Sequence, residues 1–383
     1  MPQRPLNIAI IGAGPAGLYL AILLRRRGAD HRIRIFEQNA RDSTFGFGVA
    51  FSQRALSVLR GRDEETWAAI WPWLEFWDDS VVSLNGESVR IDGIGYAGIA
   101  RLRLLNVLQQ LAEKLGIAAE YGRAVASIDG FADCDLLVGA DGANSMVRRS
   151  DESGFGTAVS QFSNRFAWFG TRQRFESLTH TFVETPFGAF NAHHHRHAPE
   201  MSTFVVEVDE PAFFRCGFDR MDSAEAQTFC ESIFRQVLNG KGLISNKSIW
   251  RRFQRVANRR WWSGNRVLLG DALHTAHFSI GSGTRMAMED AAALASAIET
   301  HGSDIAGVFT AFEQGRRLPS ERLVGAADNS ANWYENFAGH MRLPLMEFAM
   351  SYITRSGRVG MDDLRRSSAG FVAQYEQYRQ GKR

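Results

Sequence analysis

The sequence predicts an α/β fold, with a Rossmann-like nucleotide-binding domain, an inserted β-sheet domain and C-terminal helices. Three observations support this prediction. The N-terminus reads as an apolar strand, a glycine-rich turn and a helix, and two later apolar strands each end in a loop that contains Gly and Asp. The central part of the chain alternates apolar and polar residues, as half-buried β-strands do.

The N-terminal segment has the pattern of a dinucleotide-binding unit. Residues 6–11 form a β-branched run, residues 12–17 read Gly-Ala-Gly-Pro-Ala-Gly, and residues 18–27 show helical spacing. In this fingerprint the first glycine makes the turn, the second lets the backbone approach a pyrophosphate, and the third lets the helix pack close to the strand. The residues that we expect at the cofactor are Gly12, Gly14, Ala16 and Gly17.

A second strand, residues 32–37, ends in an acidic residue. Glu37 follows Gly17 by twenty residues, where a carboxylate accepts hydrogen bonds from the ribose of an adenine nucleotide. The segment therefore predicts an adenylated cofactor, but by itself it does not distinguish NAD from FAD. Because only one such fingerprint is present, a second dinucleotide is expected to bind transiently.

In each of two later segments, an aspartate follows directly after an apolar strand. Asp141-Gly142 follows one strand pattern, and Gly270-Asp271 follows another. Open α/β sheets bind their ligands at the carboxyl ends of the strands. The cofactor residues assigned here are Asp141, Gly142, Gly270 and Asp271.

The loop 278–283 leads from Asp271 into a helix that starts near Thr284. A helix N-terminus stabilises negative charge, and a reduced flavin carries such charge on its ring. We therefore add Gly281, Gly283 and Thr284 to the cofactor residues. A glycine-rich connector without a ligand is the alternative interpretation of this loop.

The order of these motifs resembles that of the FAD-dependent aromatic hydroxylases of the p-hydroxybenzoate hydroxylase type. Residues 45–52 and 270–284 are most similar to the branch of salicylyl-CoA 5-hydroxylase and 2-aminobenzoyl-CoA monooxygenase. The resemblance implies bound FAD, transient NADH or NADPH, and O2, with a flavin C4a-hydroperoxide that hydroxylates an aromatic ring. The expected substrate is an aryl-CoA thioester such as salicylyl-CoA. A free aromatic acid or phenol, or a non-oxygenating flavin oxidoreductase reaction, remains the alternative.

The resemblance also implies roles for individual residues. Arg101 would reach the ribityl-pyrophosphate region, Asp271 the ribityl chain, and Asp141-Gly142 with Arg148 both FAD and NAD(P)H. A surface position at the start of a helix is the alternative for Arg101, and a turn-forming role is the alternative for Asp141. The residues expected to touch flavin or substrate are His277, Phe278, Ile280 and Ser282, with a capping role as the alternative for His277.

The predicted domains interleave along the chain. Residues 1–72, 98–155 and 261–300 form the FAD-binding domain, residues 73–97 and 156–260 the substrate domain, and residues 301–383 a helical region. Strands are expected at 162–170, 180–184, 187–195 and 202–208, and a hairpin at 81–91 with an Asn85-Gly86 turn. Within the helical region, residues 308–316 and 326–337 show helical patterns.

Three clusters have a structural and a functional interpretation. The histidines at 193, 194, 195 and 197 are not expected to bind metal, because no carboxylate or cysteine accompanies them, but His193 or His195 could bind substrate or coenzyme. The arginines at 251, 252, 255, 259 and 260 favour a solvated face over contacts to CoA phosphates. The tryptophans at 67, 71, 73 and 77 are expected to pack in the core.

The composition excludes further classes of protein. The 383 residues are 45% hydrophobic and carry a net charge of +2 at pH 7, which gives no reason to expect nucleic acid or an anionic membrane as partner. Three cysteines are too few for a disulfide framework or a zinc site, and no apolar run is long enough to span a membrane. We expect a cytoplasmic monomer or homodimer without a metal.

Overall fold

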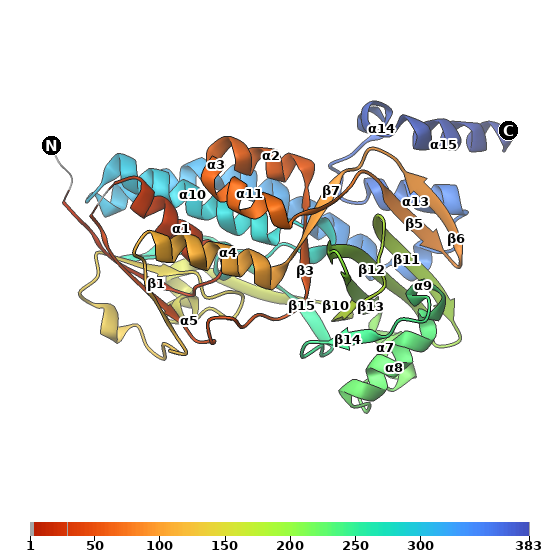
Figure 1. Ribbon diagram of the computed structural model, residues 1–383, viewed down its shortest axis with the longest axis horizontal. Coiled ribbons are helices and arrows are strands. Elements are labelled where there is room, and N and C mark those ends of the chain that lie inside the picture. The colour runs from red at the N-terminus through yellow and green to blue at the C-terminus, as the bar shows by residue number, and fades with distance from the viewer. Residues whose placement is uncertain (1–3, 29, 383) are drawn as a thin grey trace. The chain divides into compact units, whose positions relative to one another are not determined.

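A computed structural model describes residues 4–28 and 30–382. The chain divides into two compact units, each built from three separate segments (Figure 1). Unit 1 consists of Met1–Ser43, Leu104–Gln161 and Gln254–Gly325, and unit 2 of Thr44–Arg103, Phe162–Phe253 and Ala326–Arg383. Both units are therefore discontinuous in the sequence.

The main sheet of unit 1 has the strand order β16-β17-β9-β1-β2-β8. Every neighbouring pair is parallel except β16 with β17, and Ile10 of β1 lies opposite both Ile35 and Val138. The carboxyl ends of these parallel strands therefore meet at one edge. The strands are β1 (Asn7–Ile11), β2 (Arg32–Glu37), β8 (Ala119–Tyr121), β9 (Leu136–Gly139), β16 (Trp262–Ser263) and β17 (Arg266–Leu268).

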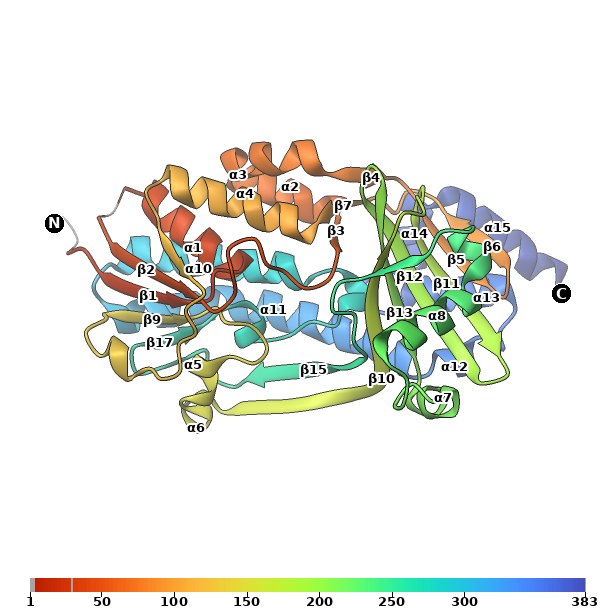
Figure 2. The ribbon, with the colours of Figure 1, turned by 60° about the horizontal axis from the view of Figure 1, so that its bottom comes forward.

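Helices α1 (Pro15–Arg26) and α10 (Gly283–His301) pack against each other beside this sheet (Figure 2). Residues 16–24 of α1 are all buried, as expected for a helix that lies between a sheet and a second helix. Gly28, with a positive φ of 77°, follows the end of the helix, where glycine adopts this conformation at low cost. The short helices of this unit are α5 (Met146–Arg149) and α6 (Glu152–Phe155), and α4 (Arg101–Lys114) enters it from unit 2.

Unit 2 contains an eight-stranded sheet with the order β14-β10-β13-β12-β11-β5-β6, and β15 also pairs with β10. The pairing is antiparallel for β10 with β13 and β14, for β12 with β11 and β13, and for β5 with β6, and it is parallel for β11 with β5. The strands are β5 (Ser80–Leu84), β6 (Glu87–Ile91), β10 (Thr157–Thr171), β11 (Leu178–Thr185), β12 (Gly188–Ala198), β13 (Met201–Val208), β14 (Leu243–Ser245) and β15 (Arg251–Asn258). The predicted central strands thus form one sheet.

The predicted hairpin is present between β5 and β6. Leu84 pairs with Glu87, and the two turn residues, Asn85 and Gly86, have positive φ values of 49° and 93°. A two-residue turn of this kind needs positive φ at both positions, which Asn and Gly adopt at low cost. The short sequence signal was therefore sufficient to place this turn.

A smaller sheet of unit 2 has the order β3-β7-β4. Its strands are β3 (Gly48–Ser52), β4 (Glu75–Trp77) and β7 (Tyr96–Ala100), and helices α2 (Gln53–Arg62) and α3 (Glu64–Ile70) lie between β3 and β4 in the chain. The prediction of four core tryptophans is wrong for two of them. Trp77 is buried and Trp67 is half-buried, but Trp71 and Trp73 are 49% and 45% exposed, because Pro72 forms a 3-10 turn that interrupts the helical spacing.

Each face of the large sheet carries an apolar core. On one face, residues such as Phe169, Phe190 and Phe204 pack with α7 (Glu210–Cys216), α8 (Ser223–Ile233) and α9 (Arg235–Leu238). On the other, Val82 and Phe182 pack with the C-terminal helices. These helices are α11 (Ile305–Glu335), α12 (Phe337–His340), α13 (Leu345–Thr354), α14 (Met361–Ser367) and α15 (Ala369–Gly381).

The C-terminal region is helical, as predicted, and its part within unit 2, from Ala326 on, covers one face of the large sheet. The two helical patterns at 308–316 and 326–337 lie largely in one helix, α11, which continues through Pro319. Over the described part of the chain, none of the helices combines the length and the apolarity that a membrane crossing needs.

Candidate active site

The glycine-rich turn after β1 forms a close-packed cradle. A Cβ atom on Gly12 would lie 2.3 Å from the carbonyl oxygen of Ala140, and one on Gly17 would lie 2.1 Å from the carbonyl oxygen of Gly12. Gly14 differs, because a Cβ atom there would meet nothing within 4 Å. The first and third glycines therefore allow the turn to pack, whereas the second leaves open space in front of the N-terminus of α1.

Glu37 lies at the end of β2 and contacts this turn. Its Oε2 accepts a hydrogen bond from the backbone N–H of Ala13 at 3.0 Å, and its Oε1 accepts from the N–H and the side-chain amide of Asn39 at 2.8 and 2.7 Å. These three donors fix the carboxylate beside the glycine turn. Oε1 already accepts two hydrogen bonds, whereas Oε2 accepts one and has a further lone pair for a ribose hydroxyl.

Asp141 caps a helix as well as ending a strand. Its Oδ2 accepts from the N–H of Met146 at 2.6 Å and from that of Val147 at 3.3 Å, at the start of α5. Burial raises the pKa of this carboxyl, and its Oδ1 is buried without a hydrogen-bond partner among the described residues. The turn role and a ligand role are thus compatible, because each uses a different oxygen.

Arg148 was expected to contact FAD and NAD(P)H, but the structure gives its guanidinium other partners. Nη1 donates to the carbonyl oxygen of Ala272 at 3.1 Å, and Nη2 donates to that of Ala143 at 2.6 Å. The side chain is buried. Arg148 therefore joins the loop after β9 to the loop after β17, and we assign it to positioning these loops rather than to direct contact.

The Gly270-Asp271 loop is held by a buried ionic cluster that the sequence interpretation missed. The N–H of Gly270 donates to Oδ2 of Asp290 at 3.2 Å, and the same carboxylate bonds His274 Nε2 at 2.8 Å and Arg316 Nε at 2.9 Å. Burial opposes the charge of Asp290, but His274 and Arg316 outweigh burial and lower the pKa of this carboxyl. The side chain of Asp271 itself is exposed.

A signal for Asp290 was present in the sequence. Met286, Asp290 and Leu294 recur at a spacing of four residues, so a helix over this segment places all three on one buried side. An acid within an apolar stripe requires a buried cationic partner. Only the structure shows that the partners are His274 and Arg316.

The loop before α10 has the expected compact form. Gly281 has a positive φ of 59°, Phe278 and Ile280 are half-buried, and the hydroxyl of Ser282 donates to the carbonyl of Ile280 at 3.2 Å. His277 is buried, and its Nδ1 lies 2.9 Å from the hydroxyl of Ser279. These contacts support the capping alternative for His277. Contact of any of these residues with flavin or substrate stays a prediction.

Unit 2 places its histidines on two faces of one sheet. His193 and His195 of β12 share a face with His180 of β11, which lies opposite His193. The Nδ1 atom of His180 is hydrogen-bonded to Tyr334 Oη at 3.2 Å. His194 points to the other face, where it bonds the hydroxyl of Thr181 at 3.0 Å. Burial lowers the pKa of both His193, to about 4, and His194, to about 3, so these imidazoles are neutral at pH 7.

The predicted arginine contacts divide between the two units. Arg101 begins α4 in unit 2, where its N–H donates to the carbonyl of Phe47 at 2.7 Å and its guanidinium lies 5.8 Å from the ring centre of Trp168. In the arginine-rich segment, Arg252 pairs with Glu210 in unit 2, and Arg260 donates to backbone carbonyls of α6 in unit 1. These partners favour a structural role for Arg252 and Arg260.

Comparison with known proteins identifies the family. The FAD binding domain family matches residues 6–64 and 107–323, which is more than half of the chain. The chain belongs to the FAD-dependent aromatic hydroxylases. The hydroxylase is 38% identical over 361 residues to a salicyloyl-CoA 5-hydroxylase from a Streptomyces species, covering 92% of this chain and 70% of the relative.

Two further relatives cover the hydroxylase almost completely. It is 32% identical to the 3-hydroxy-4-methyl-anthranilyl-(aryl-carrier protein) 5-monooxygenase of Streptosporangium sibiricum, over 96% of this chain and 99% of the relative. It is also 32% identical to the protodeoxyviolaceinate monooxygenase of Chromobacterium violaceum, over 91% of this chain and 94% of the relative. The hydroxylase is therefore a flavoprotein monooxygenase that uses FAD.

Solved structures support the same fold. A tetrameric form of 2-methyl-3-hydroxypyridine-5-carboxylic acid oxygenase matches with a TM-score of 0.73 at 18% identity, over 92% of this chain and 98% of that one. PqsL of P. aeruginosa, in complex with 2-aminobenzoylacetate, matches with a TM-score of 0.68 at 19% identity, over 88% and 99%. At these identities the likeness concerns the fold alone.

The residues of unit 1 fit FAD. Gly14 leaves open space at a helix N-terminus, Glu37 is fixed beside it, and Asp141 keeps a buried oxygen without a partner. Gly283 begins α10, and a Cβ atom there would meet nothing within 4 Å. These features are of the kind that a pyrophosphate, sugar hydroxyls and an anionic ring require.

The hydroxylase also buries an acid that these motifs did not predict. Glu207 of β13 accepts a hydrogen bond from the amide of Asn164 at 2.9 Å, and burial, together with Glu335, raises the pKa of Glu207 to about 8. Replacing Glu207 by glutamine is expected to increase the free energy of unfolding by about 3 kcal/mol at pH 7, because the folded wild type must hold a proton there.

The stabilisation by Glu207→Gln should depend on pH. The pKa of Glu207 is raised on folding, so the stability of the wild type should fall as pH rises from about 4.5 to 8, and Glu207→Gln should remove this fall. Urea unfolding across this range measures it. Glu200→Gln, in the exposed turn before β13, removes the same charge and should leave the dependence intact; equal behaviour of the two variants would refute the prediction.

Proposed function

We propose that this hydroxylase inserts one oxygen atom of O2 into the aromatic ring of an aryl thioester such as salicylyl-CoA. The main support is that two relatives with 38% and 32% identity over more than nine-tenths of the chain are named for thioester substrates, one on CoA and one on an aryl-carrier protein. In the overall reaction, NAD(P)H, a proton, O2 and the arene give NAD(P)⁺, the phenol and water.

The chain's own residues bind and orient the cofactor in this proposal. Gly12, Gly14 and Gly17 would admit the pyrophosphate to the N-terminus of α1, and Glu37 would accept hydrogen bonds from the adenosine ribose. Bound FAD, once reduced by NADH or NADPH, would supply the activation of O2. The N-terminus of α10 at Gly283 would stabilise the negative charge of the reduced ring.

The loop residues would contact the reacting groups. Asp271, whose carboxylate is exposed, would bind the ribityl chain, and Arg101 would bind phosphate oxygens with its guanidinium. Phe278 and Ile280 would keep water from the ring, because both present apolar side chains in the loop before α10. His277 would act through Ser279, which its imidazole holds in place.

A free aromatic acid or phenol is the second candidate substrate. It is favoured by the likeness to a 3-amino-4-hydroxybenzoate 2-monooxygenase of Streptomyces cremeus, which is 28% identical over 78% of this chain and 80% of the relative. The identity is lower and the coverage smaller than for the two thioester enzymes. We therefore place this candidate second.

Oxygen consumption tests both candidates. FAD-loaded protein would be given NADH or NADPH with salicylyl-CoA, 2-aminobenzoyl-CoA, the free acids or no substrate, and product mass would be recorded. We expect oxygen uptake with a thioester and a product heavier by one oxygen atom. Stimulation by a free acid alone would support the second candidate, and NAD(P)H oxidation without any oxygenated product would contradict both.

A further inference from the structure

His195 of β12 is a buried side chain without a hydrogen-bond partner. It is 3% exposed, and neither Nδ1 nor Nε2 has a partner among the described residues. The great majority of buried polar side-chain atoms in folded proteins are hydrogen-bonded, so two unpaired nitrogens on one ring are unusual. Leaving them unpaired destabilises the folded protein, whereas a bound ligand could satisfy both nitrogens.

A second unpaired donor lies beside His195. Trp77, the last residue of β4, is 4% exposed, and its indole Nε1 also has no partner among the described residues. The ring centres of Trp77 and His195 are 5.6 Å apart. An indole N–H is a donor only, whereas a neutral imidazole is a donor at one nitrogen and an acceptor at the other.

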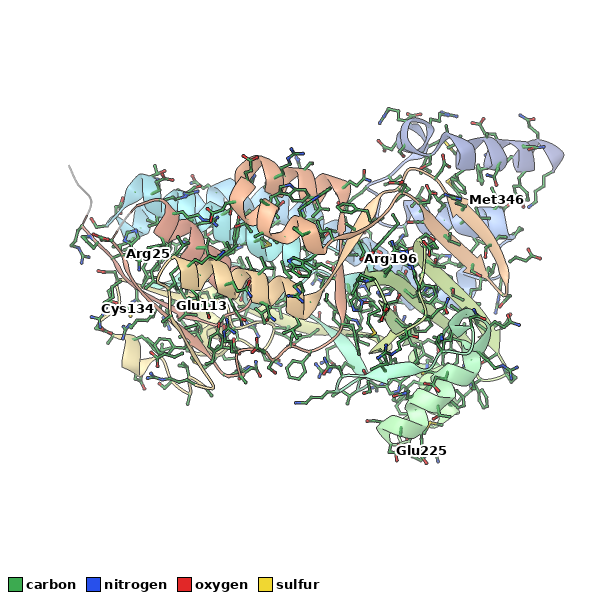
Figure 3. The ribbon with its side chains drawn as sticks, in the orientation of Figure 1. Arg25, Glu113, Cys134, Arg196, Glu225 and Met346 are labelled. Carbon is green, nitrogen blue, oxygen red and sulfur yellow. The ribbon has the colours of Figure 1, made fainter. Side chains whose placement is uncertain are left out.

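The pair is held in place by groups that are themselves satisfied. Arg196, the next residue on β12 and labelled in Figure 3, donates through Nε to Glu75 of β4 at 2.6 Å and through Nη2 to the carbonyl of Phe76 at 3.3 Å. These bonds fix β4, and hence Trp77, against β12. The rings of His193 and His195 stack, with centres 6.5 Å apart and planes 3° apart.

We propose that His195 and Trp77 bind the hydroxyl or amino substituent of the aromatic substrate and so determine its selection. The inference rests on the proposed function, since it names contacts to that substrate. A phenolic hydroxyl can accept from the indole N–H and donate to the imidazole, and an arylamine also offers both roles.

Because His195 and Trp77 are both uncharged, the pair favours a neutral substituent on the substrate ring. Burial, with His193, His197 and His194 nearby, lowers the pKa of His195, so the imidazole is uncharged at pH 7. An ionised carboxylate bound between a neutral imidazole and an indole would lack a cationic partner there, which is costly in a buried place. A hydroxyl or amine carries no such cost.

Binding measurements test the inference without turnover. Isothermal titration calorimetry of FAD-loaded protein, without NAD(P)H, would compare salicylyl-CoA with benzoyl-CoA, which lacks the hydroxyl. We expect the wild type to bind salicylyl-CoA at least about 10-fold more tightly. His195→Phe and Trp77→Phe should each bring this ratio to within about 2-fold, whereas His195→Gln, which keeps a donor and an acceptor, should retain most of it.

Thermal stability separates a binding role from a structural one. His195→Phe should keep or raise the Tm, because it removes two unpaired buried nitrogens. The matched control is His194→Phe on the opposite face, which loses the bond to Thr181 and should lower the Tm but leave the ratio unchanged. An unchanged ratio in both His195→Phe and Trp77→Phe, or a lowered Tm in His195→Phe with the ratio retained, would overturn the inference.

The binding results distinguish failure of the proposed function from failure of this inference. If the wild type binds neither thioester, the thioester proposal fails, and salicylate against benzoate then tests the hydroxyl contact in the same variants. If the wild type binds salicylyl-CoA but the variants keep its preference, only the inference fails. Binding of none of the four ligands by the wild type would contradict both.

Discussion

Gly14→Ala is expected to leave the apoprotein folded and to weaken FAD binding by at least about 100-fold. Gly14 has an extended backbone, with φ −76° and ψ −177°, and an added Cβ atom would meet no protein atom within 4 Å. The methyl group would instead project into the space where the backbone must approach a pyrophosphate. FAD affinity by fluorescence titration and the Tm of the apoprotein together measure the effect.

Two other glycines provide the controls. Gly12→Ala should lower the free energy of unfolding by at least about 3 kcal/mol, because φ is +104° and the new Cβ atom would lie 2.3 Å from the carbonyl oxygen of Ala140. Gly130→Ala, in the turn Asp129–Phe131 with open space around it, should change neither FAD affinity nor stability. Unimpaired FAD binding by Gly14→Ala would contradict the placement of the pyrophosphate.

Asp290→Asn is expected to lower the free energy of unfolding by about 3 kcal/mol, because the buried Arg316 loses one of its two carboxylate partners and keeps only Glu289. Asp290 is fully buried and bonds Arg316, His274 and the N–H of Gly270. FAD binding should also weaken, since the Gly270-Asp271 loop loses its anchor. Urea unfolding and FAD titration measure the two effects separately.

The pH range follows from the direction of the pKa shift. Because the pKa of Asp290 is lowered on folding, its stabilisation is present above the ordinary Asp value of about 3.9 and is lost as pH falls through the lower folded value. The destabilisation by Asp290→Asn should thus be present at about pH 5 and should shrink as pH falls below about 4. Glu299→Gln, in the same helix and paired at the surface with Arg27, should cost at most about 1 kcal/mol. A similar cost for both variants would refute the prediction.

The sequence by itself determined the nucleotide-binding part of this protein. The strand, turn and helix of residues 6–27, the acid Glu37 and the Asp-Gly and Gly-Asp loops were all predicted at the places where the structure has them. These features depend on residues close together in the chain, on apolar periodicity and on glycines at tight turns. The Asn85-Gly86 hairpin was predictable for the same reason.

Tertiary structure alone decided which buried polar groups meet. The pairing of Asp290 with Arg316 joins helices α10 and α11, and Arg148 links two loops that are more than a hundred residues apart in the chain. The partner of a buried charge is set by how helices and strands pack, and local periodicity carries no information about that.

The same limit applies to exposure and to the substrate contacts. Trp71 and Trp73 are exposed although their spacing suggested a core, because one proline redirected the chain. Alternation along β12 could place His193 and His195 on one face, but only the packing of β4 against that strand brings Trp77 to His195. Which face of a sheet is covered, and by what, depends on contacts between segments distant in the sequence.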